Sequence, residues 1–140
     1  MPRPKLLGLD FDGTVVAHRF PEIGEVFPGA VEVLKELQNE GVGIILNTCR
    51  EDQPERRFLH EAAEWFAERH IGLRSINANN RQDEFREFEG ERRKVFADVY
   101  LDDRDFFLDG VINWWEIRKR FVRMGWLPRL AGRPIWAQGL

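Results

Sequence analysis

Short apolar runs alternate with amphipathic segments along most of the chain. Four of the runs have the length of strands, at 6–9, 42–46, 73–76 and 95–101. Between and after them, apolar residues recur at helical spacing over three segments, at 28–40, 54–71 and 111–124. The first strand, helix and strand form a βαβ unit, which requires its two strands to be parallel. The pattern therefore predicts an α/β fold built on a mostly parallel sheet.

The length and composition of the chain are those of one globular domain covering residues 1–140. Apolar residues make up 43% and charged residues 32%, which argues against disorder. A formal net charge of −3 argues against nucleic acid as a general partner but is compatible with a small phosphorylated substrate. No apolar run approaches about 20 residues, so no membrane span or signal peptide is predicted. The single cysteine, Cys49, suits a reducing compartment, and we expect a cytoplasmic protein in which this thiol is a small buried hydrophobe.

The first strand leads directly into two aspartates, Asp10 and Asp12, and then into a glycine that lets the chain turn away. Alternate residues of an extended chain share a face, so the two carboxylates are expected side by side. At about 4 Å they repel each other by roughly 4 kcal/mol, and a shared proton, a basic side chain or a divalent cation must offset this cost. A nucleophilic carboxylate beside a carboxylic acid could attack a phosphoryl group and protonate the departing oxygen. The alternative is a solvated Asp-x-Asp-Gly turn without chemistry.

Two later strands also end in polar residues that could join this pair. Thr48 follows the second strand, and Asp102 and Asp103 follow the last one. Because ligands of open parallel sheets bind outside the carboxyl ends of the strands, these side chains are expected to converge with Asp10. Lys94, just before the last strand, has a stem long enough to reach back to them. The coincidence favours a reaction centre over a set of unrelated turns.

Four short motifs resemble, in order and spacing, those of the haloacid dehalogenase-like superfamily: LDFDGT, NTCR, the lysine of RRKVFADVY and the pair in YLDD. The resemblance spans residues 6–105, and the superfamily consists mostly of magnesium-dependent phosphohydrolases. It implies a three-layer α/β/α sandwich with a Rossmann-like sheet. Cap domains that select the substrate are inserted in this family after the first motif or between the second and third. Both gaps are short here, so no cap domain is expected.

The resemblance implies a role for each matching residue. Asp10 is the implied nucleophile that becomes an aspartyl-phosphate, and Asp12 is the implied general acid, which later activates the hydrolytic water. Thr48 is expected to hydrogen-bond a phosphoryl oxygen, and Lys94 to offset charge on the nucleophile and the phosphate. An acid at position 12 favours phosphate chemistry over carbon–halogen cleavage.

The implied cofactor is Mg²⁺, a hard cation that prefers oxygen ligands and keeps several waters. The expected ligands lie at two strand ends, namely Asp10, Asp12 through its backbone carbonyl, Asp102 and Asp103. Asp103 could orient a metal-bound water or cap the turn, and a contribution from Asp105 is also left open.

Candidate substrate-binding residues follow the second strand and precede the last one: Asn47, Thr48, Arg50 and Lys94. Arg50 is equally well explained as an exposed arginine paired with Glu51 or Asp52. His18 is a weaker candidate, chosen only because it follows the first motif. The arginines from Arg118 to Arg133 are expected to form a solvated face rather than a phosphate-binding track.

The function expected from these residues is hydrolysis of a phosphomonoester through an intermediate on Asp10, with the substrate left open. An open site suits a bulky or macromolecular phosphoester, or a site completed by a second subunit, so a homo-oligomer is left open too. The rival hypothesis is a regulatory protein of the same fold that binds Mg²⁺ and phosphate without turnover. Asp12 discriminates between them, because a stable phosphoacceptor needs no acid beside its nucleophile.

Overall fold

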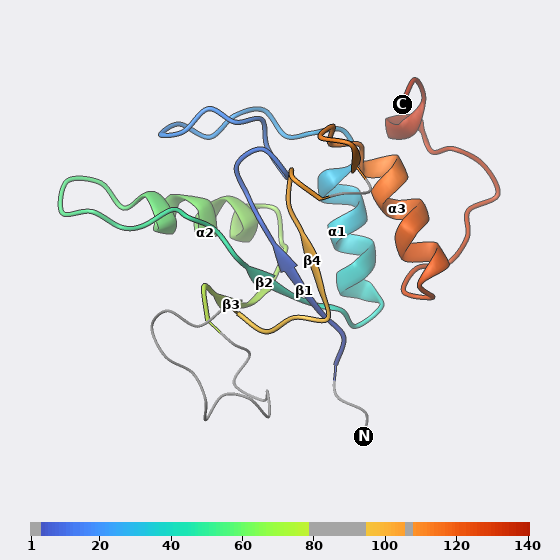
Figure 1. Cartoon of the computed structure of the whole chain (residues 1–140), viewed down its shortest axis with the longest axis horizontal. Coiled ribbons are helices and arrows are strands. Elements are labelled where there is room, and N and C mark those ends of the chain that lie inside the picture. The colour runs from blue at the N-terminus through green and yellow to red at the C-terminus, as the bar shows by residue number, and fades with distance from the viewer. Residues whose placement is uncertain (1–3, 79–94, 106–107) are drawn as a thin grey trace.

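The chain folds around a four-stranded sheet whose strands are all parallel (Figure 1). The computed structural model describes residues 4–78, 95–105 and 108–140. Its strands, in the spatial order β3-β2-β1-β4, are β1 (Leu6–Leu9), β2 (Gly43–Leu46), β3 (Leu73–Ile76) and β4 (Val99–Leu101). Its helices are α1 (Ala30–Asn39), α2 (Phe58–Glu68), α3 (Trp114–Arg123) and the short 3₁₀ helix η3 (Ile135–Ala137). This architecture confirms the predicted single-domain α/β fold with a Rossmann-like sheet.

The strand β1 lies between β2 and β4 and pairs with both of them in parallel. Its last residue, Leu9, is opposite Leu46 of β2 and Leu101 of β4. All three strands therefore end at the same edge of the sheet. The chain adds β2 and β3 on one side of β1 and then returns to add β4 on the other side. Strand order thus reverses between β1 and β4, which is the position where open α/β sheets bind ligands.

The larger hydrophobic core joins one face of the sheet to all three α-helices. Its buried side chains include Leu9 of β1, Leu34 of α1, Phe66 of α2 and Ile117 of α3. Successive side chains of β1 alternate between the two faces. A smaller cluster covers the opposite face and consists of Leu6, Ile45, Val95 and Ala97. Residues 79–94, between β3 and β4, lie outside the described residues.

Two elements are shorter than the hydrophobic pattern predicts. The helix α2 begins at Phe58 rather than near Pro54, because the preceding residues form a loop in which Asp52 bridges to Arg57. The strand β4 covers only the last part of the predicted run 95–101. The apolar residues at the start of that run are buried on the second face of the sheet without strand pairing, so burial extends further than the strand. None of the helices in the described parts of the chain is long and apolar enough to span a membrane.

A buried ion pair joins α1 to α3, two helices that lie side by side (Figure 1). Arg118 of α3 is 1% exposed, and its guanidinium donates hydrogen bonds of 2.5 and 3.0 Å to the carboxylate of Glu36 on α1. The expectation of a solvated arginine face is therefore wrong at Arg118. This residue shares the buried stripe of α3 with Trp114 and Phe121, and Glu36 supplies the counter-charge that such a position requires.

We expect Glu36→Ala to lower the free energy of unfolding by about 2–3 kcal/mol, because it leaves the buried charge of Arg118 without a partner. The value is below that of a fully buried pair, since the Glu36 side chain is 33% exposed. Glu32→Ala removes an exposed carboxylate from the same helix and should cost less than about 1 kcal/mol. Urea unfolding followed by circular dichroism measures both losses. Equal losses in the two variants would contradict the role given to the ion pair.

Candidate active site

Backbone hydrogen bonds bring the ends of three strands together. The N–H of Asp10 donates to the carbonyl of Leu101 at 3.0 Å, and the N–H of Asn47 donates to the carbonyl of Leu9 at 2.8 Å. Asp10 is therefore the register neighbour of Asn47 on one side and of Asp102 on the other, with adjacent strands about 4.8 Å apart. Asp10 and Asp102, which are far apart in the sequence, thus lie side by side as predicted, and Asn47 lies beside Asp10 on the other strand.

The Asp10 carboxylate is partly buried at this edge. Its Oδ2 accepts a hydrogen bond of 3.1 Å from the hydroxyl of Thr14, which is itself fully buried. Burial, together with smaller contributions from the negative charges of Asp103 and Asp102, raises the pKa of Asp10 from its ordinary value of 3.8 to about 6. Hydrogen bonds from the Phe11 backbone and from Thr14 oppose the rise without cancelling it. Such a carboxylate favours a neighbouring positive charge.

The turn after Asp10 is anchored to two helices. Phe11 is fully buried and packs its ring 5.4 Å from those of Trp65 and Phe66 on α2. On the other side, Nε1 of Trp114 on α3 donates a hydrogen bond of 3.0 Å to the carbonyl of Thr14. The position of the carboxylate at residue 10 is thus set by the hydrophobic core rather than by the site alone.

The turn after β4 presents one aspartate to the site and uses another to hold its shape. A Cβ added at Gly13, whose φ is +86°, would lie 2.8 Å from Oδ2 of Asp103, so this carboxylate lies against the turn that follows Asp10. Asp105 instead accepts a 3.1 Å hydrogen bond from the N–H of Asp102, and burial raises its pKa. Of the two residues left open by the sequence, Asp103 faces the site and Asp105 braces the turn.

The acidic residues fit a magnesium ion by the kind of donor they offer. Among the described residues, no three His, Cys, Asp or Glu side chains stand together as a complete metal site. The carboxylates of Asp10, Asp102 and Asp103 nevertheless lie close enough for the last two to raise the pKa of the first. Carboxylate oxygens that repel one another are the donors that Mg²⁺ takes, with waters completing its shell. The predicted metal set stays a prediction, and Asp12 could contribute only its backbone carbonyl.

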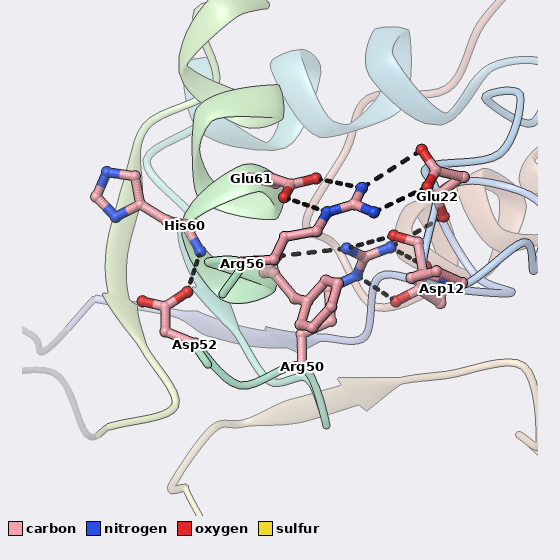
Figure 2. Close-up of polar contacts among 9 residues, drawn as sticks. Asp12, Glu22, Arg50, Asp52, Arg56, His60 and Glu61 are labelled. Carbon is pink, nitrogen blue, oxygen red and sulfur yellow. Dashed lines mark hydrogen bonds and ion pairs between the residues drawn. The ribbon is translucent and has the colours of Figure 1, made fainter. Parts of the chain in front are cut away.

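The side chain of Asp12 is held by a buried arginine, as Figure 2 shows. Nε of Arg50 donates to Oδ2 of Asp12 at 2.7 Å, and an Nη donates to Oδ1 at 2.8 Å, which makes a bidentate ion pair. Arg50 is 2% exposed. Its remaining N–H groups donate to the backbone carbonyls of Pro21, Glu22 and Phe58.

This arrangement corrects both interpretations of Arg50. The side chain is not an exposed arginine paired with Glu51 or Asp52, because it is buried and paired with Asp12. It is also not free to bind a substrate phosphate, since a guanidinium has five N–H donors and all of them are engaged within the chain. In this structure Arg50 fixes Asp12 and the loop beside it.

The other predicted site residues lie as follows. Thr48 and Asn47 line a cavity over the strand ends, and the Thr48 N–H donates to the side chain of Asn77 at 2.8 Å. The Thr48 hydroxyl accepts a hydrogen bond of 3.2 Å from the N–H of Arg50. Lys94 lies outside the described residues, so the structure does not test its predicted role.

The cavity has a volume of about 580 Å³, and Asp10, Asp12, Asp102 and Asp103 all line it. Its walls also include His18 and several residues that were not predicted for the site, among them Phe20, Cys49, Tyr100 and Arg104. The expectation of a buried thiol is wrong, because Cys49 is exposed in this cavity. His18 was a weaker candidate, and its place after the first motif was the signal. No motif marks Phe20 or Arg104, and Tyr100 stands in the quoted motifs without a role assigned to it; only closeness to a strand end or to the first motif could have indicated these three residues.

The chain is similar to a solved structure described as that of a conserved protein coded by a locus of Bacteroides thetaiotaomicron. The two share 36% sequence identity with a TM-score of 0.71, over 88% of this chain and 93% of the other. No protein-family model matches the chain, and no curated protein matches it. The likeness to the solved structure extends over most of both chains.

Arg50→Lys should lower the free energy of unfolding by about 2–4 kcal/mol, because an ammonium cannot reproduce the bidentate pair and leaves buried carbonyls without a donor. Arg57→Lys is the matched control, since Arg57 is exposed and should change stability by less than about 0.5 kcal/mol. Chemical unfolding of both variants provides the comparison. A loss below about 1 kcal/mol for Arg50→Lys would show that the buried pair does not hold this region together.

In the absence of divalent cations, Asp10→Asn should stabilise the protein at neutral pH. The folded-state pKa of Asp10 is about 6 and its ordinary value is 3.8, so the native chain binds this proton more tightly than the unfolded chain does. The ionised carboxylate therefore lowers the stability of the folded chain. This loss is absent below pH 3.8, grows as the pH rises toward 6, and is complete above pH 6. The shift corresponds to at most about 3 kcal/mol, which solvent contact reduces to about 1–2 kcal/mol.

Unfolding in the presence of a chelator at about pH 4 and at about pH 7.5 measures this difference. Asp10→Asn should match the wild type at the lower pH and exceed it at the higher one. Asp109→Asn, which changes an exposed aspartate outside the cavity, should show no such dependence on pH. If the difference in unfolding free energy between Asp10→Asn and the wild type is the same at both pH values, the surroundings of Asp10 do not raise its pKa.

Proposed function

Since this chain belongs to the same family as the conserved protein of Bacteroides thetaiotaomicron, we propose that it is a magnesium-dependent phosphomonoesterase of the haloacid dehalogenase-like superfamily. One observation carries the proposal: Asp10, Asp102 and Asp103 meet beside the point where strand order reverses. An acidic cluster at this edge suits a divalent cation, whose positive charge offsets that of the carboxylates and of a bound phosphate. The four motifs of the resemblance support the same reaction.

Asp10 is the proposed nucleophile. One of its carboxylate oxygens attacks the phosphorus, and the new O–P bond forms as the bond to the leaving oxygen breaks and the alcohol takes up a proton. Water then attacks the phosphorus of the aspartyl-phosphate, which releases inorganic phosphate and restores the carboxylate. The hydrogen bond from Thr14 and the buried ring of Phe11 hold the carboxylate in one orientation throughout.

Asp10, Asp102 and the backbone carbonyl of Asp12 would hold Mg²⁺, with Asp103 able to orient one of its ligands. When bound, the cation supplies the positive charge that offsets the phosphate and the acidic residues. Lys94, for which the structure gives no position, has the proposed role of adding a second positive charge.

Asp12 is the proposed general acid, and its ion pair sets a condition on that role. Its carboxylate must turn from the Arg50 guanidinium before it can protonate the leaving oxygen. The same ion pair favours a second candidate function, namely a protein that binds Mg²⁺ and phosphate without turnover. A carboxylate held permanently by Arg50 would serve that second function equally well.

Release of phosphate from p-nitrophenyl phosphate separates the two candidates. The wild-type chain should release phosphate with Mg²⁺ and not with excess chelator, because the acidic cluster needs its cation. Asp10→Asn should reduce kcat by about a thousandfold or more, since it removes the nucleophile. Asp109→Asn is the control and should keep the wild-type rate.

Activity that survives in Asp10→Asn would reject Asp10 as the nucleophile. Absence of turnover with the wild type, combined with Mg²⁺-dependent binding of inorganic phosphate in calorimetry, would favour the binding protein over the enzyme.

A further inference from the structure

The loop between β1 and α1 carries an aromatic ring into the cavity that contains Asp10. The ring belongs to Phe20, which is 49% exposed and lines the cavity together with His18. Two antiparallel backbone contacts close the base of this loop, where Val16 bridges to Val26 and the N–H of Ala17 donates to Glu25. Removing a phenylalanine ring from water is favourable by about 2–3 kcal/mol, so the exposed part of this ring would gain free energy from contact with an apolar group of a ligand.

The buried guanidinium of Arg50 contacts the Phe20 ring and helps to fix its position. Its Cζ lies 5.1 Å from the centre of the Phe20 ring, within the range of a cation–π contact. The same guanidinium donates to the carbonyls of Pro21 and Glu22, the next two residues of the loop. The loop therefore cannot move the ring away from the site without breaking contacts to a buried charge.

Two further contacts connect the Phe20 ring and its loop to the start of α2. The ring of Phe58 lies 5.2 Å from that of Phe20 at an angle of 52°. Arg56 joins Glu22 of the loop to Glu61 of α2, as Figure 2 shows, with hydrogen bonds of 2.9 and 2.8 Å. Hydrogen bonds from Arg56 lower the pKa of both carboxylates, so the connection is ionic at neutral pH. Phe20 is thus a preorganised surface rather than a flexible side chain.

The cavity is larger than a phosphate requires. Its volume of about 580 Å³ lies within the range of sites that enclose a whole small molecule. Besides the polar residues at the strand ends, the cavity is lined by the aromatic side chains of His18, Phe20 and Tyr100, which a leaving group could contact once the phosphate lies at Asp10.

We propose that Phe20 is a stacking platform for a planar ring in the leaving group, so that the site prefers phosphomonoesters whose alcohol carries a nucleobase or another aromatic ring. This inference rests on the proposed function, because it assumes that the phosphate lies at Asp10. A planar ring can stack on an exposed aromatic face without any specific hydrogen bonds. A saturated ring of similar size gains only the burial of apolar surface.

Matched pairs of esters test the platform. Benzyl phosphate and cyclohexylmethyl phosphate differ in the planarity of the ring, while uridine 5′-monophosphate and ribose 5-phosphate differ in the base. For the wild type, kcat/KM should be higher for the planar member of at least one pair by about fivefold or more, the lower end for one stack. A preference in the second pair alone would identify a nucleobase, and one in both pairs any aromatic ring.

Variants of the loop attribute the preference to Phe20. Phe20→Leu should bring the ratio within each pair to about one, whereas Phe20→Tyr should keep it, because a phenol stacks as a phenyl ring does. Val26→Ala is the matched control: it shortens another exposed apolar residue of the same loop and should leave the ratio unchanged. A wild-type ratio near one in both pairs, or a preference that survives in Phe20→Leu, would overturn the inference.

Failure of the proposed function gives a different result. If the wild type releases phosphate from none of the four esters, the enzyme proposal fails. Calorimetry then tests whether Phe20 still acts as a stacking platform for a bound ligand. Tighter binding of uridine 5′-monophosphate than of ribose 5-phosphate, lost in Phe20→Leu, would support it. Equal binding of the two would overturn it.

Discussion

Parallel pairing of β1 with a strand on each side is the constraint on which the rest of the structure depends. It sets Asp10 opposite the end of β4 and Asn47 opposite the end of β1, through hydrogen bonds of the main chain alone. The acidic residues are brought together by the sheet, although their charges repel one another. The core beneath them, in which Phe11 packs on α2, offsets that repulsion in the folded chain.

A single buried arginine connects the site to the segments around it. Arg50 holds the Asp12 carboxylate with two hydrogen bonds and uses its other donors on the loop after β1 and on α2. Its face also lies against the rings of Phe11 and Phe20. One side chain thus links the candidate acid, the hydrophobic core and the wall of the cavity. A movement of Arg50 that frees Asp12 would therefore also break hydrogen bonds to the loop that carries Phe20.

The sequence predicted the features that depend on neighbouring residues. It did not predict the ion pairs whose two members lie far apart in the chain. Short apolar runs predicted the strands, and the polar residues at the strand ends predicted the meeting of Asp10 with Asp102. Nothing near Arg50 indicates that its partner is Asp12, because that ion pair forms only once β1 and β2 are adjacent. Arg118 was assigned to the surface for the same reason, since its partner Glu36 lies on another helix. Local patterns determine which segments form elements, whereas these buried charges are satisfied only by the tertiary fold.

Reduction of the working protein with borohydride tests the central claim most directly, because borohydride converts an aspartyl-phosphate to homoserine and leaves free carboxylates unchanged. The protein would be treated during turnover of p-nitrophenyl phosphate with Mg²⁺, and its peptides analysed by mass spectrometry. We expect homoserine at position 10 and at no other aspartate. Release of phosphate without any modification of Asp10, or homoserine at a different position, would contradict the account.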